Sequence, residues 1–209
     1  MRIRVTFSKT GALRYIGHLD LHKLWERSLR RADMALMYSL GFHPQPKIQL
    51  ASALPLGFSS RCEIVDLWID GEVNLTELPS RLTKSVPPGL GIMHVIEVDE
   101  KSPPMQTQIN TSEYLVTLFF DADIEKLQKT ISFSLSKASM ARERRGKAYD
   151  LRPLIDSIEI GTPDADGWTT LIMILAAREG ATGRPEEVLD ELGIPYEDTR
   201  VERRQFTFK

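Results

Sequence analysis

Residues 2–32 read RIRVTFSKTGALRYIGHLDLHKLWERSLRRA, and the period of their apolar residues changes once. From Arg2 to Ser8 apolar and polar residues alternate, which is typical of a strand with one buried face. From His18 onward apolar residues recur at helical spacing, while most basic residues lie outside the apolar face. Residues 10–17, which include two glycines, connect the two patterns. The stretch therefore predicts a strand followed by a helix.

The rest of the first hundred residues adds a second helix and three more strands. Gly41 and the prolines at positions 44 and 46 interrupt the chain after the first helix. The pattern then predicts strands at 47–54 and 62–70, a helix at 75–86 and a strand at 90–98. The order β-α-β-β-α-β is that of the ferredoxin-like motif.

The same order recurs after residues 101–110, which have two adjacent prolines and no period and are predicted to be a linker. The expected strands are 113–120, 151–160, 169–177 and 200–208, and the expected helices are 124–133 and 186–192. We therefore predict an α+β protein of two tandem ferredoxin-like units with antiparallel sheets, residues 1–100 and 111–209.

Composition excludes several classes of protein. The chain has 209 residues, 42 % hydrophobic and 27 % charged, as in an ordinary globular protein, and we expect it in the cytoplasm. No apolar run approaches the roughly 18 residues that span a bilayer, so no membrane contact is expected. The single cysteine, Cys62, excludes an internal disulfide and a cysteine-based iron–sulfur or zinc site.

Positive charge is concentrated near the start of the chain. Residues 2–61 carry ten Lys or Arg and three acids, while the whole protein has a net charge of −2. Such asymmetry is typical of a surface that meets a polyanion.

The start of the first helix is one candidate site. There, free backbone N–H groups, Arg14 and His18 could hold a phosphate, and His18 could act as a general acid. Alternatively, His18 or Asp20 simply caps the helix. His18 and His22 have the spacing of metal ligands on a helix, but no third ligand is nearby in sequence, so no metal is expected.

Three arginines of the same helix, Arg27, Arg30 and Arg31, have Glu26 as the only acid among them. They are candidates for phosphate contacts, or else form a solvated face.

The following loop, 38–47, contains Gly41 and two prolines that would stiffen its tip. Phe42 and His43 could stack on an unpaired base, with Lys47 contacting phosphate. The alternative for Phe42 is a buried anchor of the loop, whereas His43 beside a proline is expected to be exposed.

A second basic cluster lies at 142–147, and contributes Arg142, Arg144 and Arg145. It is either a second phosphate-binding arm or a mobile loop. The chain contains no Gly-rich phosphate loop, dinucleotide fingerprint, Gly-x-Ser-x-Gly elbow or radical-SAM cysteine cluster, so no cofactor of its own is expected and catalysis is not indicated.

Several of these segments together resemble the bacterial radical SAM-linked protein family, a domain of unknown function. The resemblance rests on residues 14–21, 26–27, 30–32, 39–48 and 54–57, with a weaker motif at 150–153. It implies a B12-binding-type radical-SAM protein as partner. It also implies an RNA or ribosome context, since genes for an E/G-type ribonuclease and ribosomal proteins often lie nearby. The chain also resembles, more faintly and in architecture only, the RNA-processing endonucleases of CRISPR systems. Those enzymes have a glycine-rich loop near the C-terminus, to which residues 180–183 of this chain are only poorly similar.

Three functions remain open at this stage. The first is an RNA-binding accessory protein that presents rRNA or tRNA to a radical-SAM enzyme. The second is a metal-independent endoribonuclease that uses His18 or His43 as general acid–base. The third is a subunit that docks on the radical-SAM enzyme through protein contacts alone.

Overall fold

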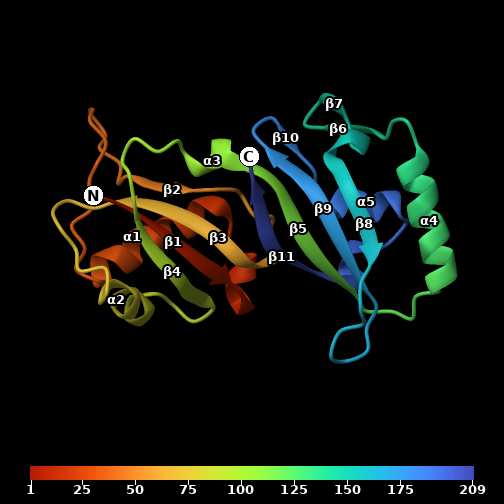
Figure 1. Ribbon diagram of the computed structural model, residues 1–209, viewed down its shortest axis with the longest axis horizontal. Helices are drawn as coiled ribbons and strands as arrows, with labels where there is room; N and C mark the ends of the chain where they lie inside the picture. The colour runs from red at the N-terminus through yellow and green to blue at the C-terminus, as the bar shows by residue number, and fades with distance from the viewer. The chain divides into compact units, whose positions relative to one another are not determined.

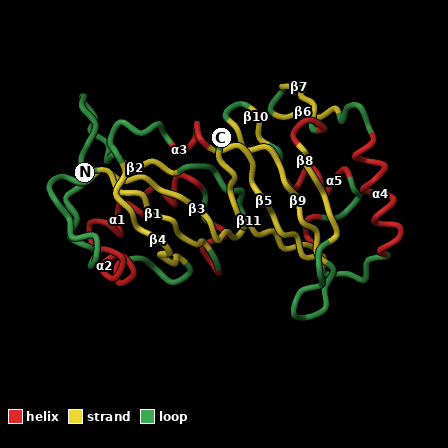
Figure 2. Tube along the Cα trace, in the orientation of Figure 1, coloured by secondary structure: helices red, strands yellow, loops and turns green.

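The computed structural model of the protein describes residues 1–209, which form two compact units, Met1–Gln108 and Ile109–Lys209 (Figure 1). Helices, strands and loops alternate in both units (Figure 2). No helix is long and apolar enough to cross a membrane.

The first unit is a four-stranded antiparallel sheet with helices on one face. Its strands follow the order β2-β3-β1-β4. The elements are β1 (Arg2–Lys9), a 3-10 turn (Gly11–Tyr15), α1 (His18–Arg31), β2 (Ile48–Leu50), β3 (Ser59–Trp68), α2 (Leu78–Ser85), β4 (Leu90–Val98) and α3 (Met105–Gln108).

Alternation in β1 places Ile3, Val5 and Phe7 on the face that α1 covers. Phe7 meets Trp25 edge to face, with ring centroids 5.0 Å apart, and neither side chain is exposed. The strand and the helix bury their apolar residues against each other, and the Phe7–Trp25 pair is part of this contact. The change of period in residues 2–32 therefore marks the point where the buried face passes from the strand to the helix.

The second unit repeats this connectivity with one inserted hairpin. The sheet order is β8-β9-β5-β11. The short strand β10 also pairs with β9, on the same side as β8. The elements are β5 (Ile109–Leu118), α4 (Ile124–Ser136), the hairpin β6 (Ala141–Arg144) and β7 (Lys147–Asp150), a 3-10 turn (Arg152–Leu154), β8 (Ile155–Ile160), β9 (Thr170–Arg178), β10 (Ala181–Thr182), α5 (Pro185–Glu191), a 3-10 turn (Tyr196–Asp198) and β11 (Thr199–Phe208). The predicted α+β class with antiparallel sheets is confirmed.

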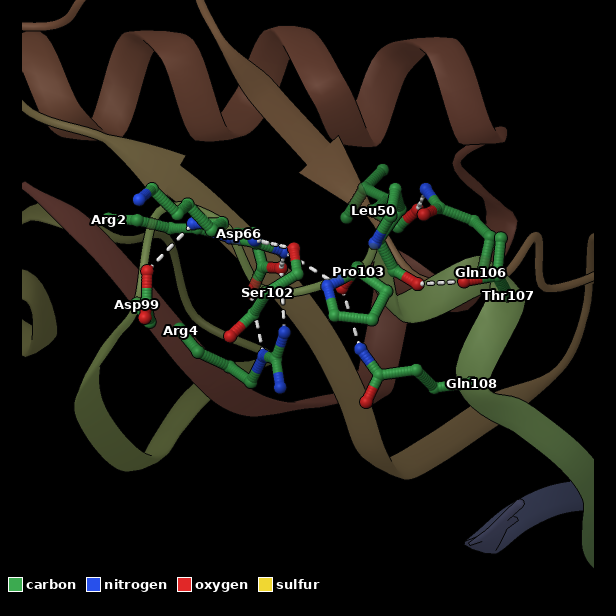
Figure 3. Close-up of polar contacts among 12 residues, drawn as sticks. Arg2, Arg4, Leu50, Asp66, Asp99, Ser102, Pro103, Gln106, Thr107 and Gln108 are labelled. Atoms are coloured by element: carbon green, nitrogen blue, oxygen red, sulfur yellow. Dashed lines mark hydrogen bonds and ion pairs between the residues drawn. The ribbon is translucent and has the colours of Figure 1, made fainter.

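The segment 101–108, expected to be part of a linker, belongs to the first unit. The buried Arg2 donates to the backbone carbonyls of Ser102 and Pro103, and the Gln106 amide donates to the Leu50 carbonyl at 2.6 Å (Figure 3). Met105 is buried, and β5 already begins at Ile109. The prolines remove any regular period, but two carbonyls of this segment accept hydrogen bonds from the terminal nitrogens of the buried Arg2 guanidinium.

The basic cluster at 142–147, expected to be a loop, is the β6–β7 hairpin. Its two turn residues, Arg145 and Gly146, both have positive φ, 49° and 73°. Positive φ at both central positions is the signature of a type I′ turn, which matches the twist of a two-residue hairpin.

Candidate nucleic-acid interface

Part of the positive charge near the N-terminus is used inside the first unit. Arg2 and Arg4 both contact the buried Asp66 of β3, at 2.6 and 2.8 Å (Figure 3). Lys9 is buried as well, and its ammonium donates to the Ile16 carbonyl at 3.1 Å. The excess counted over residues 2–61 therefore overstates the charge that reaches solvent.

A row of cations remains on the surface of α1. Lys23, Arg27 and Arg31 follow one another at intervals of four, which places them on one face of the helix. All three are exposed, and they line a hollow of about 400 Å³ together with Asp20, Leu24 and the nearby Ile16 and Pro87. We call Lys23, Arg27 and Arg31 the basic stripe.

No acidic side chain forms an ion pair with the basic stripe, although Asp20 lines the same hollow. Lys23 and Arg27 form no ion pair, and Arg31 donates only to the neutral Ser28 hydroxyl, at 3.1 Å. Sequence reasoning singled out Arg27 and Arg31 but not Lys23, although its spacing of four from Arg27 was the available signal.

Arg30 lies apart from this stripe. Its guanidinium pairs with Glu26 at 2.7 Å and donates to the Tyr38 hydroxyl at 3.2 Å. Arg30 thus holds the start of the loop 38–47 rather than standing free beside Arg31.

The start of α1 has no side-chain cap, since the N-cap residue is Gly17. Neither His18 nor Asp20 therefore fills the capping role. Partial burial lowers the pKa of His18, and His22 lowers it further, while the buried Glu63 acts in the opposite direction. The lowered pKa favours the neutral imidazole. His18 would therefore have to become protonated before it could form an ion pair with a bound phosphate.

Arg14 lies beside this helix start in an unusual environment. Its guanidinium lies 4.8 Å from the centre of the Tyr15 ring, and its buried Nε has no hydrogen-bond partner. No three or more His, Cys, Asp and Glu side chains are grouped as metal ligands, and no residue is assigned to a metal.

The loop 38–47 closes on itself and presents an apolar tip. Ser39 N–H donates to the Gln45 carbonyl at 2.8 Å, and Gln45 N–H donates to the Ser39 hydroxyl at 3.0 Å. Leu40 and Phe42 are completely exposed at the tip. The alternative of a buried Phe42 is therefore wrong, because the loop is closed by polar contacts at its base and needs no apolar anchor.

His43 is also exposed, as its place before Pro44 suggested, whereas Lys47 is half-buried next to β2. The loop thus offers Phe42 and His43 side by side in sequence, with no hydrogen bond that restrains either side chain.

In the second unit only one of the three predicted arginines forms an ion pair. Arg142 pairs with Glu191 of α5 at 2.6 Å and lies 3.7 Å from Asp190. Arg144 and Arg145 are exposed and form no ion pair. With Lys147, the last residue of the predicted cluster, and Arg184, which was not singled out from the sequence, they line a second hollow of about 710 Å³.

Comparison with known proteins adds a family but no activity. A family model described as "Uncharacterized protein conserved in bacteria (DUF2344)" matches residues 2–185. No curated protein matches the sequence.

Among solved structures, the chain is similar to one from a Cbf5-Nop10-Gar1 complex, with 7 % identity and a TM-score of 0.51. The match covers 98 % of this chain and 48 % of that one, so this chain spans about half the length of its structural relative. An archaeal box H/ACA sRNP Nop10-Cbf5 complex gives 12 % identity and a TM-score of 0.47, over 97 % of this chain and 46 % of that one. At such low identity the first likeness concerns the fold alone.

Proposed function

Since the chain belongs to the bacterial family DUF2344, whose description names no activity, we propose a function from its surface: the protein binds RNA through its first unit. The carrying observation is the basic stripe, three exposed cations on one helix face without an acidic partner. The free-energy cost of binding phosphate is small for unpaired cations, because no existing ion pair has to break first.

The dimensions of the stripe suit a nucleic-acid strand. Lys23 and Arg31 are eight residues apart, which is about 12 Å along a helix. One strand of a duplex carries a phosphate for roughly each 3.4 Å of axis, so the stripe could accompany about three phosphates. The exposed Phe42 and His43 add rings on which an unpaired base could stack.

The accessory role is part of this proposal. Presentation of rRNA or tRNA to a B12-binding-type radical-SAM enzyme is supported by the sequence resemblance. Large apolar side chains exposed around the start of α1, Tyr15, Leu19 and Leu56, support a protein partner in addition to RNA. The ribonuclease alternative has less support, because no side-chain hydrogen bond orients His18 or His43 for proton transfer.

We also assign each unit to the ferredoxin-like fold. The support is that both units combine the connectivity β-α-β-β-α-β with an antiparallel sheet in which the first strand lies between the third and the fourth.

The RNA proposal is tested by charge reversal of the stripe. We expect K23E/R27E/R31E to bind bulk tRNA and rRNA fragments at least about tenfold more weakly than the wild type in a filter-binding assay. The slope of log K against log salt should also become shallower by about 2, because three phosphate contacts on a single strand are lost.

A matched control is K84E/K126E/K129E, which makes the same charge change at exposed lysines of α2 and α4. Equal losses in both variants would mean that only overall charge matters, and the proposal would fail. Wild-type protein without any salt-dependent affinity for RNA would overturn it outright.

A further inference from the structure

The second unit contains a basic pocket of about 710 Å³, which we call the hairpin pocket. Its charged wall consists of Arg144, Arg145 and Lys147 from the β6–β7 hairpin and Arg184 from the residue before α5. Tyr149, Pro153 and Leu154 contribute rings and apolar surface, and Gly180 and Thr182 complete the lining. A volume of several hundred Å³ is in the range of sites for small organic ligands.

The charge of the hairpin pocket is not neutralised from within. None of its four cations forms an ion pair with a carboxylate. The one acid that lines it, Asp150, uses Oδ1 to accept hydrogen bonds from the N–H groups of Met140 and Arg152, at 2.7 and 3.0 Å. These backbone hydrogen bonds lower the pKa of Asp150, which therefore remains ionised, yet the pocket still has a large excess of positive charge.

The cations are presented by an anchored hairpin. Arg142 and Tyr149 face each other across the hairpin, and they bind Glu191 and Glu187, which are four residues apart on α5. Arg144 and Lys147 form the next pair on the same face, because side chains two residues apart on a strand point the same way. The two anchors thus direct this outer pair toward the pocket.

The pocket floor is fixed by close backbone packing. A Cβ on Gly183 would lie 2.6 Å from the Leu154 carbonyl oxygen, so the chain after β10 sits directly on residue 154. The hairpin and the floor of the pocket are thus each held by contacts within the second unit.

We propose that the hairpin pocket binds a nucleoside phosphomonoester, either a free mononucleotide or the phosphorylated end of an RNA. Arginine forks match a phosphate group, and several cations around one open pocket suit a dianion better than the single charge of an internal phosphodiester. Tyr149 and the apolar floor offer a surface for the base. This site lies wholly in the second unit and does not depend on RNA binding by the basic stripe.

The test is calorimetric titration of the full chain with adenosine 5′-monophosphate and with adenosine. We expect binding of the nucleotide, and binding of the nucleoside at least tenfold weaker. Affinity should rise as pH increases through about 6, where the phosphate acquires its second charge. Equal affinity for nucleotide and nucleoside, or no binding of any phosphorylated probe, would overturn the proposal.

Two variants localise the site. R144E/K147E and R184Q should each weaken nucleotide binding at least tenfold, whereas K129E, on the exposed face of α4, and the stripe variant K23E/R27E/R31E should not. Arg144 and Lys147 are exposed, so the first variant should fold, which thermal unfolding checks. Unchanged affinity in both pocket variants would place the ligand elsewhere and sink the assignment.

Short oligonucleotides with a phosphate or a hydroxyl at the 5′ or 3′ end identify the source of the ligand. Tighter binding of the phosphorylated oligonucleotide than of the mononucleotide indicates an RNA end. The opposite order indicates a free nucleotide. Both outcomes support a phosphomonoester site, whereas no preference for phosphorylated ends combined with no nucleotide binding contradicts it.

Discussion

Asp66 holds two arginines of the neighbouring strand, although only 1 % of its side chain is exposed. Replacing Asp66 with Asn removes the negative charge and leaves the buried Arg2 without its counterion. We expect the free energy of unfolding of Asp66→Asn to fall by about 3–5 kcal/mol, as measured by urea denaturation. The control Asp70→Asn changes an exposed carboxylate nearby in sequence and should have little effect. A similar loss in the two variants would contradict a special role for Asp66.

Tyr149 provides a second prediction at the scale of one residue. Burial, together with its hydrogen bond to Glu187, raises the pKa of Tyr149 to about 12. One of the five tyrosines should therefore ionise late in a spectrophotometric titration of the phenolate, and Tyr149→Phe should remove that late step. Glu187→Gln should lower the pKa of Tyr149 only part of the way toward its ordinary value, because burial is the larger cause of the shift.

The same shift has a consequence for stability. Between pH 10 and 12 the folded protein keeps a proton on Tyr149 that the unfolded chain releases, so the contribution of this residue is complete below pH 10. It is lost as the pH rises through 12. Identical alkaline unfolding curves for the wild type and Tyr149→Phe would show that the hydroxyl is not held in this way.

The β6–β7 hairpin allows a prediction at the scale of one element. Arg142→Gln removes the ion pair with Glu191, so we expect faster hydrogen exchange of the amides of residues 141–150. The matched change Arg145→Gln removes a charge from the turn without breaking an ion pair, and should leave exchange unchanged. Equal exchange in both variants would mean that the hairpin does not depend on its anchor.

Elements differ in how far local sequence determines them. Strand β1 and helix α1 follow from period alone, because each buries one regular face. The hairpin was missed since its charged residues have no apolar period and its Arg-Gly turn is not a common hairpin signal. In β11 the alternation that buries Val201 and Arg203 does not continue, because a bulge between Arg203 and Gln205 puts Phe206 among the buried residues.

At the scale of the whole molecule, the lesson concerns charge. The concentration of Lys and Arg near the N-terminus is visible in the sequence, and it directs attention to α1. Which cations reach solvent depends on partners distant in the chain, such as Asp66 for Arg2, and no local pattern reveals these. The hairpin pocket was only half visible for the same reason, since Arg184 joins it from about forty residues beyond Arg144.

The exposed tip of the loop 38–47 has a practical consequence for the search for partners. Phe42 stands fully accessible next to Gly41 in a surface loop, where a protease specific for aromatic residues can reach the chain. Limited digestion with such a protease therefore offers a footprint: the rate of cleavage after Phe42 reports directly whether an RNA or a protein covers this loop. A candidate ligand can then be recognised by the protection it gives, even before its role is known.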